Sequence, residues 1–96
     1  MKSLQTTDVF DHCYNGLRDR QGRARIAARL RRVELGNFGD VKPVGSGVSE
    51  LRIDYGPGYR VYLTQRGLEV VILLAGGDKR TQSKDIEAAI EMAKQL

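Results

Sequence analysis

The sequence is poor in the residues that crosslink small domains or bind metals, since it has one cysteine, Cys13, and one histidine, His12. A single cysteine excludes a disulfide framework, and the two residues together are too few for a Cys/His zinc cluster. We therefore predict neither a metal site nor a cofactor. Adjacent side chains on a helix point about 100° apart. This spacing favours a small core residue at Cys13 and a solvated His12 over a catalytic thiol and imidazole pair.

The sequence also lacks long hydrophobic runs. The longest is Val70 to Ala75, far short of the ~20 apolar residues that a membrane-spanning helix needs. The first residues, MKSLQTTDVFD, lack the apolar core of a signal peptide. We expect a cytoplasmic protein with no membrane partner.

The positive charge is concentrated at one end of the chain. The 96 residues are 41% hydrophobic and 29% charged, a balance typical of a globular protein, and they fit one domain over residues 1–96. The net charge is +4, and all of this excess lies in residues 1–35, where seven arginines fall between Arg18 and Arg32. Arginine favours planar contacts with phosphate or carboxylate. The cluster indicates nucleic acid, an acidic partner segment or simply a solvated helix face.

Helical spacing predicts two helices in the first third of the chain. The first begins at Thr7 or Asp8 and ends near Leu17, with residues 19–22 as a connection or kink. The second covers about residues 23–35 and ends at Gly36, which suits the left-handed conformation after a helix. A last helix is predicted after residue 82, with Ser83 as its N-cap and an apolar stripe of Ile86, Ala89, Ile90 and Ala93.

After residue 40 the hydrophobic period becomes two and predicts four antiparallel strands. They cover about residues 40–47, 48–55, 59–65 and 68–75, and Pro43 favours an edge position for the first. The fourth is apolar on both faces, so we expect it inside the sheet, which helices cover on one side. The fold class is α+β.

A hairpin carries the candidate site residues. Gly56-Pro57-Gly58 as a three-residue loop would place Asp54 opposite Arg60, Ile53 opposite Val61 and Arg52 opposite Tyr62. Arg52, Arg60 and Tyr62 then share the outward face with Glu50. Two guanidinium groups and a phenol can bind a phosphate and stack on a base. The pattern itself favours a solvated face with an ordinary Asp54–Arg60 pair over a phosphate site.

Two stretches resemble a known superfamily. They are VELGNFGDVKPVGSGVSELRIDYGPGYRVYL from Val33 and GGDKRTQSKDIEAA from Gly76. Together they resemble the RelE/ParE toxins of bacterial toxin–antitoxin modules, in particular the HigB-like branch of addiction-module killer proteins. The resemblance implies a RelE-like microbial RNase fold, with two N-terminal helices on a mostly antiparallel four-stranded sheet and a C-terminal helix. It also implies ribosome-dependent cleavage of mRNA and a helix-turn-helix antitoxin, HigA-like, as partner.

The resemblance further implies roles for six residues. Arg60, the arginine of the GYR element, and Arg52 would be catalytic at the scissile phosphate, and RNA would be bound by Lys42, Tyr62, Lys79 and Arg80. Cations would stabilise the charge that develops when a ribose 2′-hydroxyl attacks the neighbouring phosphate.

The chain departs from the superfamily pattern that it resembles in the residues that move protons. Ile86 is the nearest match to the C-terminal tyrosine of some RelE enzymes, and no histidine lies near the predicted sheet. Tyr62 or Asp54 would have to act instead, or the ribosome would have to supply the missing group. Two alternatives remain open: a ParE-like toxin that inhibits a topoisomerase by binding, and a non-toxic relic that binds only the antitoxin.

Overall fold

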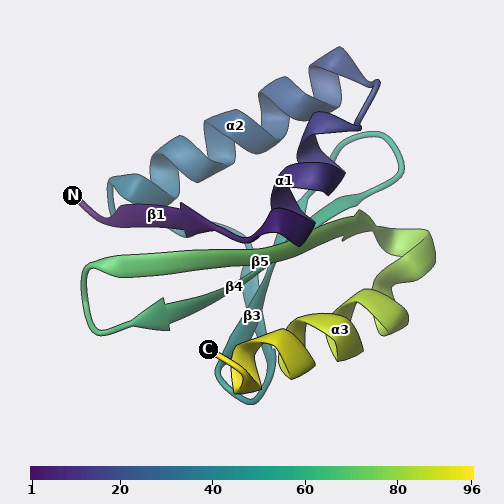
Figure 1. Ribbon diagram of the computed structural model, residues 1–96. Helices are drawn as coiled ribbons and strands as arrows, with labels where there is room; N and C mark the ends of the chain where they lie inside the picture. The colour runs from purple at the N-terminus through teal and green to yellow at the C-terminus, as the bar shows by residue number, and fades with distance from the viewer.

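The central sheet has five strands in the order β1-β5-β4-β3-β2, with helices on both of its faces (Figure 1). The computed structural model describes all residues from 1 to 96. Its elements are β1 (Ser3–Thr6), α1 (Asp8–Asn15), α2 (Arg20–Glu34), β2 (Val41–Gly45), β3 (Val48–Ile53), β4 (Tyr59–Arg66), β5 (Val70–Asp78), the short 3₁₀ helix η1 (Lys79–Thr81) and α3 (Gln82–Lys94). None of these helices has the length and apolar character needed to cross a membrane.

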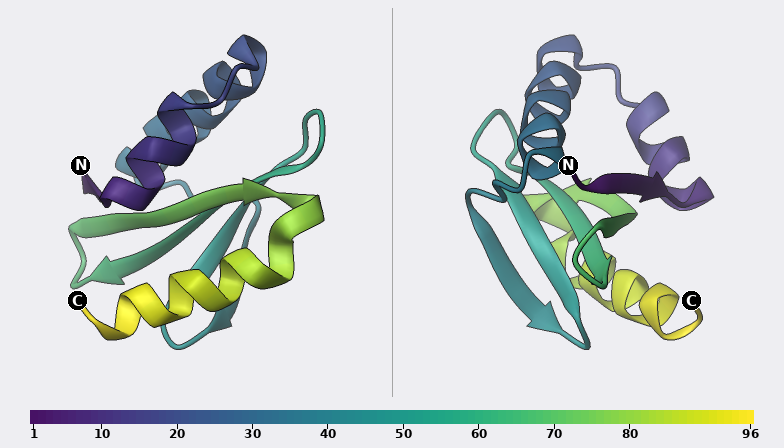
Figure 2. Two further views of the ribbon diagram at one scale, coloured as in Figure 1. Left: turned by 45° about the vertical axis from the view of Figure 1, so that its right-hand side comes forward. Right: turned by 90° about the vertical axis from the view of Figure 1, so that its left-hand side faces the viewer.

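The sheet separates two hydrophobic cores. Helices α1 and α2 cover one face and α3 covers the other, as Figure 2 shows. Phe10, Ile26 and Val33 pack on the first face, whereas Ala89 packs with Tyr62 and Leu74 on the second. The α+β class is confirmed, but the expectation of helices on one side is wrong. Strand β5 is apolar on both faces because each face meets a helix.

The prediction of four antiparallel strands is also wrong, because β1 adds a parallel strand beside β5. Its sequence, SLQT, is short and largely polar, so it shows no usable period. The next residue fixes it in place: Thr7 Oγ1 donates to the carbonyl of Leu74 at 2.6 Å and accepts from the Phe10 amide. Thr7 is thus the N-cap of α1, which confirms one of the two predicted positions, Thr7 or Asp8.

Helix boundaries differ from the predictions at two points. Asp19 accepts from the Gly22 amide and caps α2, so residues 20–22 belong to the helix rather than to a connection. At the other end of the chain, β5 continues through Gly77 to Asp78, and α3 begins at Gln82 after η1. Ser83 is therefore inside α3 and is not its N-cap.

The β3–β4 hairpin has a longer loop than predicted. Arg52 lies opposite Arg60, Ile53 opposite Tyr59 and Glu50 opposite Tyr62, a shift of two residues. Residues 54–58 form the loop, in which Gly56 and Gly58 have φ angles of 57° and 79° that other residues rarely adopt. A shift of two preserves which residues share a face. Arg52, Arg60 and Tyr62 therefore still lie on one side of the sheet, the side that α3 covers.

Candidate functional site

A polar pocket of about 340 Å³ lies where the hairpin loop meets the end of β5 and η1. Three cations from three segments line it: Arg52 of β3, Arg60 of β4 and Lys79 of η1. The loop contributes backbone at Gly58, where a Cβ atom would come within 3.3 Å of the Arg60 guanidinium. Three positive side chains around one hollow make a site suited to an anion with several oxygens, such as phosphate.

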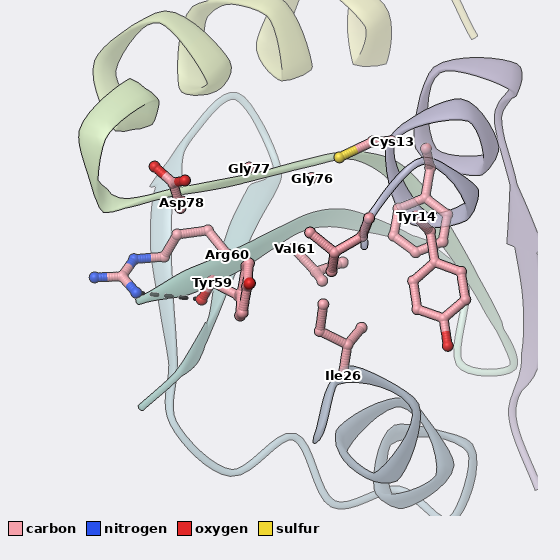
Figure 3. Close-up of a pocket in the computed structure, with 11 residues that line it drawn as sticks. Cys13, Tyr14, Ile26, Tyr59, Arg60, Val61, Gly76, Gly77 and Asp78 are labelled. Atoms are coloured by element: carbon pink, nitrogen blue, oxygen red, sulfur yellow. Dashed lines mark hydrogen bonds between the residues drawn. The ribbon is translucent and has the colours of Figure 1, made fainter. Parts of the chain in front are cut away.

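Arg60 is the most constrained of these cations. Its side chain is 8% exposed, and its Nη1 atom donates to the carbonyls of Gly58 at 3.0 Å and Tyr59 at 3.2 Å. Figure 3 shows the guanidinium extending away from the apolar side chains of Val61 and Ile26. Both hydrogen bonds of the Arg60 guanidinium are donated by Nη1, so Nη2 has no protein partner. Arg60 is thus held at one nitrogen and free to bind at another.

A buried carboxylate lies behind the arginines. Glu50 is 1% exposed, and its Oε1 lies 3.5 Å from Arg52 Nε and 3.8 Å from Arg60 Nε. Its Oε2 accepts from Tyr62 Oη at 3.1 Å and from Gln82 Nε2 at 2.8 Å. The expectation that Glu50 faces solvent is therefore wrong, because α3 and its first residue, Gln82, cover this face.

Tyr62 does not face solvent either. It is completely buried, and burial together with the Glu50 carboxylate raises the pKa of its phenol. Its ring has no free face on which a base could stack, so the predicted outward position is wrong. The hydroxyl instead orients Glu50.

Of the remaining predicted RNA-binding residues, one lies in the pocket and two lie outside it. Lys79 lines the pocket, whereas Lys42 is an exposed residue of edge strand β2 and lies outside it. Arg80 is turned toward Asp78, with Nη2 at 2.9 Å from Oδ2, and the Asp78 side chain raises the pKa of its guanidinium. The structure therefore brings together Arg52, Arg60 and Lys79, and leaves Lys42, Tyr62 and Arg80 out of the pocket.

Two carboxylates, Asp40 and Asp54, complete the ionisable lining. Both are exposed. The lining contains no histidine, cysteine or tyrosine. Proton transfer within the pocket would therefore depend on these two aspartates or on Lys79.

A second cavity, of about 150 Å³, lies under α1 and is mostly apolar (Figure 3). Cys13 contributes to its wall, and burial, followed by the nearby charge of Asp85, raises the pKa of its thiol. His12 is exposed. The separate environments of these neighbours agree with the prediction that they do not form a catalytic pair.

Glu50 and Gln82 were not predicted as parts of the site. One pattern in the sequence does indicate that Glu50 is buried, namely the apolar residues on its face of the sheet. Val48, Tyr62 and Leu74 give this face apolar residues, and the stripe of α3 needs an apolar surface to cover. A glutamate among them was therefore a candidate for burial.

Two comparisons place this chain among known proteins. Residues 17–96 match the family described as phage derived protein Gp49-like (DUF891). An uncharacterized protein from Haemophilus influenzae is 50% identical over 93 residues, which cover 97% of this chain and 94% of that protein. The chain therefore belongs to the phage-derived Gp49-like family, which is part of the addiction-module killer, or RelE-like, toxin group.

Proposed function

We propose that this protein is the toxin of a type II toxin–antitoxin module and that it cleaves mRNA on the ribosome, as a member of the HigB-like branch. Family membership supports the toxin role. The observation that carries the nuclease role is the convergence of Arg52, Arg60 and Lys79 on one pocket of phosphate-binding character. The pocket contains no metal-ligand cluster, since no group of three or more His, Cys, Asp or Glu side chains comes together in the structure.

Cleavage would follow from attack of a ribose 2′-oxygen on the adjacent phosphorus while a base takes the hydroxyl proton. The bond from phosphorus to the 5′-oxygen of the next nucleotide breaks and that oxygen gains a proton, so the products are a 2′,3′-cyclic phosphate and a 5′-hydroxyl. The phosphate gains negative charge in the transition state, and fixed cations stabilise that charge more strongly than they stabilise the ground state. Arg60 would bind a phosphate oxygen through Nη2, because Nη1 is occupied by backbone carbonyls. Arg52 and Lys79 would contact the remaining oxygens from the open side of the pocket.

Proton transfer is assigned to the exposed end of the pocket. Tyr62 is buried and its pKa is raised, so it stays protonated and serves to orient Glu50. Asp54, in the hairpin loop, is the better placed candidate for a base, since it lines the pocket beside both arginines. An enzyme that depends on the ribosome to orient its substrate would gain part of its rate from that positioning.

The experiment is induction without an antitoxin, followed by mapping of transcript 5′ ends. We expect growth arrest and new ends within translated regions. Arg52→Ala and Lys79→Ala should each lower the cleavage rate about 10²-fold or more, the usual cost of removing one charge-stabilising group. Arg66→Ala is the matched control, because Arg66 is an exposed arginine at the opposite end of β4. Full cleavage by the Arg52 and Lys79 variants would refute this site.

The antitoxin partner is tested separately. We propose a HigA-like helix-turn-helix protein, encoded next to this gene. Co-expression of that neighbour should restore growth, and the two proteins should copurify. Restoration of growth without a complex would contradict a direct antitoxin.

A ParE-like toxin that inhibits a topoisomerase is the second candidate. It is favoured by the absence of histidine, cysteine and tyrosine from the pocket lining, because a binding inhibitor needs no group to move protons. Induction of a DNA-damage response with intact transcripts would select this function. Abundant expression without any growth arrest would instead indicate a non-toxic relic.

A further inference from the structure

Glu50 contacts four polar side chains on the α3 side of the site. One carboxylate oxygen, Oε1, lies near the Nε atoms of both Arg52 and Arg60, and the other, Oε2, accepts from Tyr62 and Gln82. The contacts come from β3, β4 and the first residue of α3. A side chain that is 1% exposed therefore links the two arginines to the helix that covers them.

The two oxygens have different tasks. At 2.8 and 3.1 Å, the bonds to Oε2 are ordinary hydrogen bonds that fix the carboxylate. At 3.5 and 3.8 Å, the contacts of Oε1 are ion pairs, and the buried Nε of Arg60 has no hydrogen-bond partner at all. Glu50 therefore attracts both guanidinium groups without saturating their donors, which leaves Arg60 Nη2 and the terminal nitrogens of Arg52 for an anion.

Two arginines directly opposite each other on neighbouring strands would otherwise repel. Arg52 and Arg60 are such a pair, and like charges in this position are unfavourable. A single negative charge between their Nε atoms offsets this repulsion and keeps both heads at the same pocket.

We propose that Glu50, held in place by Gln82 and Tyr62, is a positioning residue that aligns Arg52 and Arg60 for a phosphate. This inference rests on the proposed function for its catalytic consequence, whereas the alignment itself concerns only the protein. Glu50 does not line the pocket, so it acts through the arginines and not on the substrate.

The variant Glu50→Gln separates positioning from simple neutralisation. Its amide oxygen can replace Oε2 and accept from Tyr62 and Gln82, so the volume and both hydrogen bonds are retained. Its amide nitrogen would then take the place of Oε1 and present a donor to two guanidinium groups. If Glu50 only reduced the positive charge, its removal would strengthen binding of an anion. If it aligns the arginines, removal slows cleavage even where binding is maintained.

The matched control is Thr64→Val, on the neighbouring strand β4. It removes the hydrogen bond from Thr64 Oγ1 to the carbonyl of Gly47 but leaves Glu50 and its four contacts in place. It tests the effect of a small loss of stability close to Glu50. Both variants should be checked for folding by urea denaturation before any other measurement.

Two measurements on the full-length protein test the inference. The first is the ¹H–¹⁵N spectrum of the arginine Nε–H groups. We expect Glu50→Gln to shift the Arg52 and Arg60 signals and to leave Arg66 unchanged, and Thr64→Val to leave all three close to wild type. The second is cleavage of mRNA on ribosomes. Glu50→Gln should lower kcat about tenfold to a hundredfold and keep the affinity for a 2′-deoxy, non-cleavable mRNA within about fivefold of wild type.

The outcomes are distinguishable from failure of the proposed function. If the wild-type protein cleaves no RNA, the nuclease proposal fails, but the Nε–H spectrum still decides whether Glu50 aligns the arginines. Unshifted Arg52 and Arg60 signals in a folded Glu50→Gln variant overturn the inference. Undiminished kcat with shifted signals overturns its catalytic part, and equal losses in Thr64→Val assign the effect to stability alone.

Discussion

Gly77 is the position where one methyl group should disturb the fold most selectively. It lies in β5, opposite Arg60, and a Cβ atom there would come within 1.9 Å of Asp85 Oδ2 and 3.1 Å of Thr81 Oγ1. Its φ angle is outside the left-handed region, so backbone strain is not involved. The effect of Gly77→Ala therefore depends on the contact with Asp85.

The cost can be worked out from what Asp85 must give up. To recover an ordinary contact of 3.4 Å from 1.9 Å, its carboxylate has to leave the Thr81 hydroxyl that donates to it. It also leaves the first turn of α3, where a negative charge is favourable. The bond is exposed, so we take the lower end of the range for a hydrogen bond to a charged group, about 1.5 kcal/mol. With about 0.5 kcal/mol for the helix N-terminus, we expect a loss of about 2 kcal/mol in the free energy of unfolding. For a domain of this size, this corresponds to a fall in Tm of roughly 8–16 °C.

The assay is urea denaturation, with Gly76→Ala as the matched variant. Gly76 is the preceding residue of the same strand, and its Cβ would meet Cys13 Sγ at 3.3 Å, the Arg60 carbonyl at 3.5 Å and Phe10 Cδ1 at 3.9 Å. We expect Gly76→Ala to change stability by less than about 1 kcal/mol, since a thiol can shift and alanine also restricts the unfolded chain.

A double-mutant cycle decides whether the reasoning is right. If the clash with Asp85 causes the loss, Gly77→Ala combined with Asp85→Ala should be no less stable than Asp85→Ala alone. Additive losses, or a Gly77→Ala protein as stable as wild type, would refute it.

Three further predictions concern ionisation and charge. Burial, then the hydrogen bond to Asp19, raises the pKa of Tyr59 to about 12 from an ordinary value of 10. The folded protein then keeps this proton to a higher pH than the unfolded chain does, so the free energy of unfolding should fall as pH rises from about 10 toward 12. Tyr59→Phe should flatten this fall in urea titrations. An unchanged fall would contradict the assignment. Because the pKa of Cys13 is raised, a disulfide reagent should modify it more slowly than free cysteine at pH 8, and the rate should still increase above pH 9. A rate that levels off below pH 9 would contradict this prediction. If the exposed Arg25 and Arg32 contact RNA phosphates, each Gln substitution should reduce the salt slope of binding to mRNA-programmed ribosomes by about one, and an unchanged slope would assign them to a solvated face.

The local sequence pattern is sufficient to predict most of the helices and strands. Apolar residues at helical spacing locate α1 and α2, and alternation locates β3 and β4, because each of these elements buries one side. Strand β1 could not be found in this way. It is four residues long and largely polar, and its partner, β5, lies 67 residues away in the sequence. Pairing with that distant strand makes it a strand.

The same limit explains the errors in the site. A period of two predicts which residues share a face, and Arg52, Arg60 and Tyr62 do share one. It does not show whether another element covers that face. Because α3 packs there, Tyr62 is buried rather than available to a base, and Arg60 is largely enclosed. The prediction of the hairpin register was wrong for a local reason. The loop has five residues rather than three, and two of its glycines have positive φ angles.

Burial of this face changes the electrostatics of the site. On a solvated face, water would screen Arg52 and Arg60 from each other, and neither would need a fixed partner. Under α3 the screening is weaker, so the repulsion between them and their attraction to Glu50 both increase. One carboxylate cannot neutralise two guanidinium groups, and Asp40 and Asp54 are exposed to solvent that weakens their effect. The buried end of the pocket therefore retains an excess positive charge, which a phosphate group would neutralise.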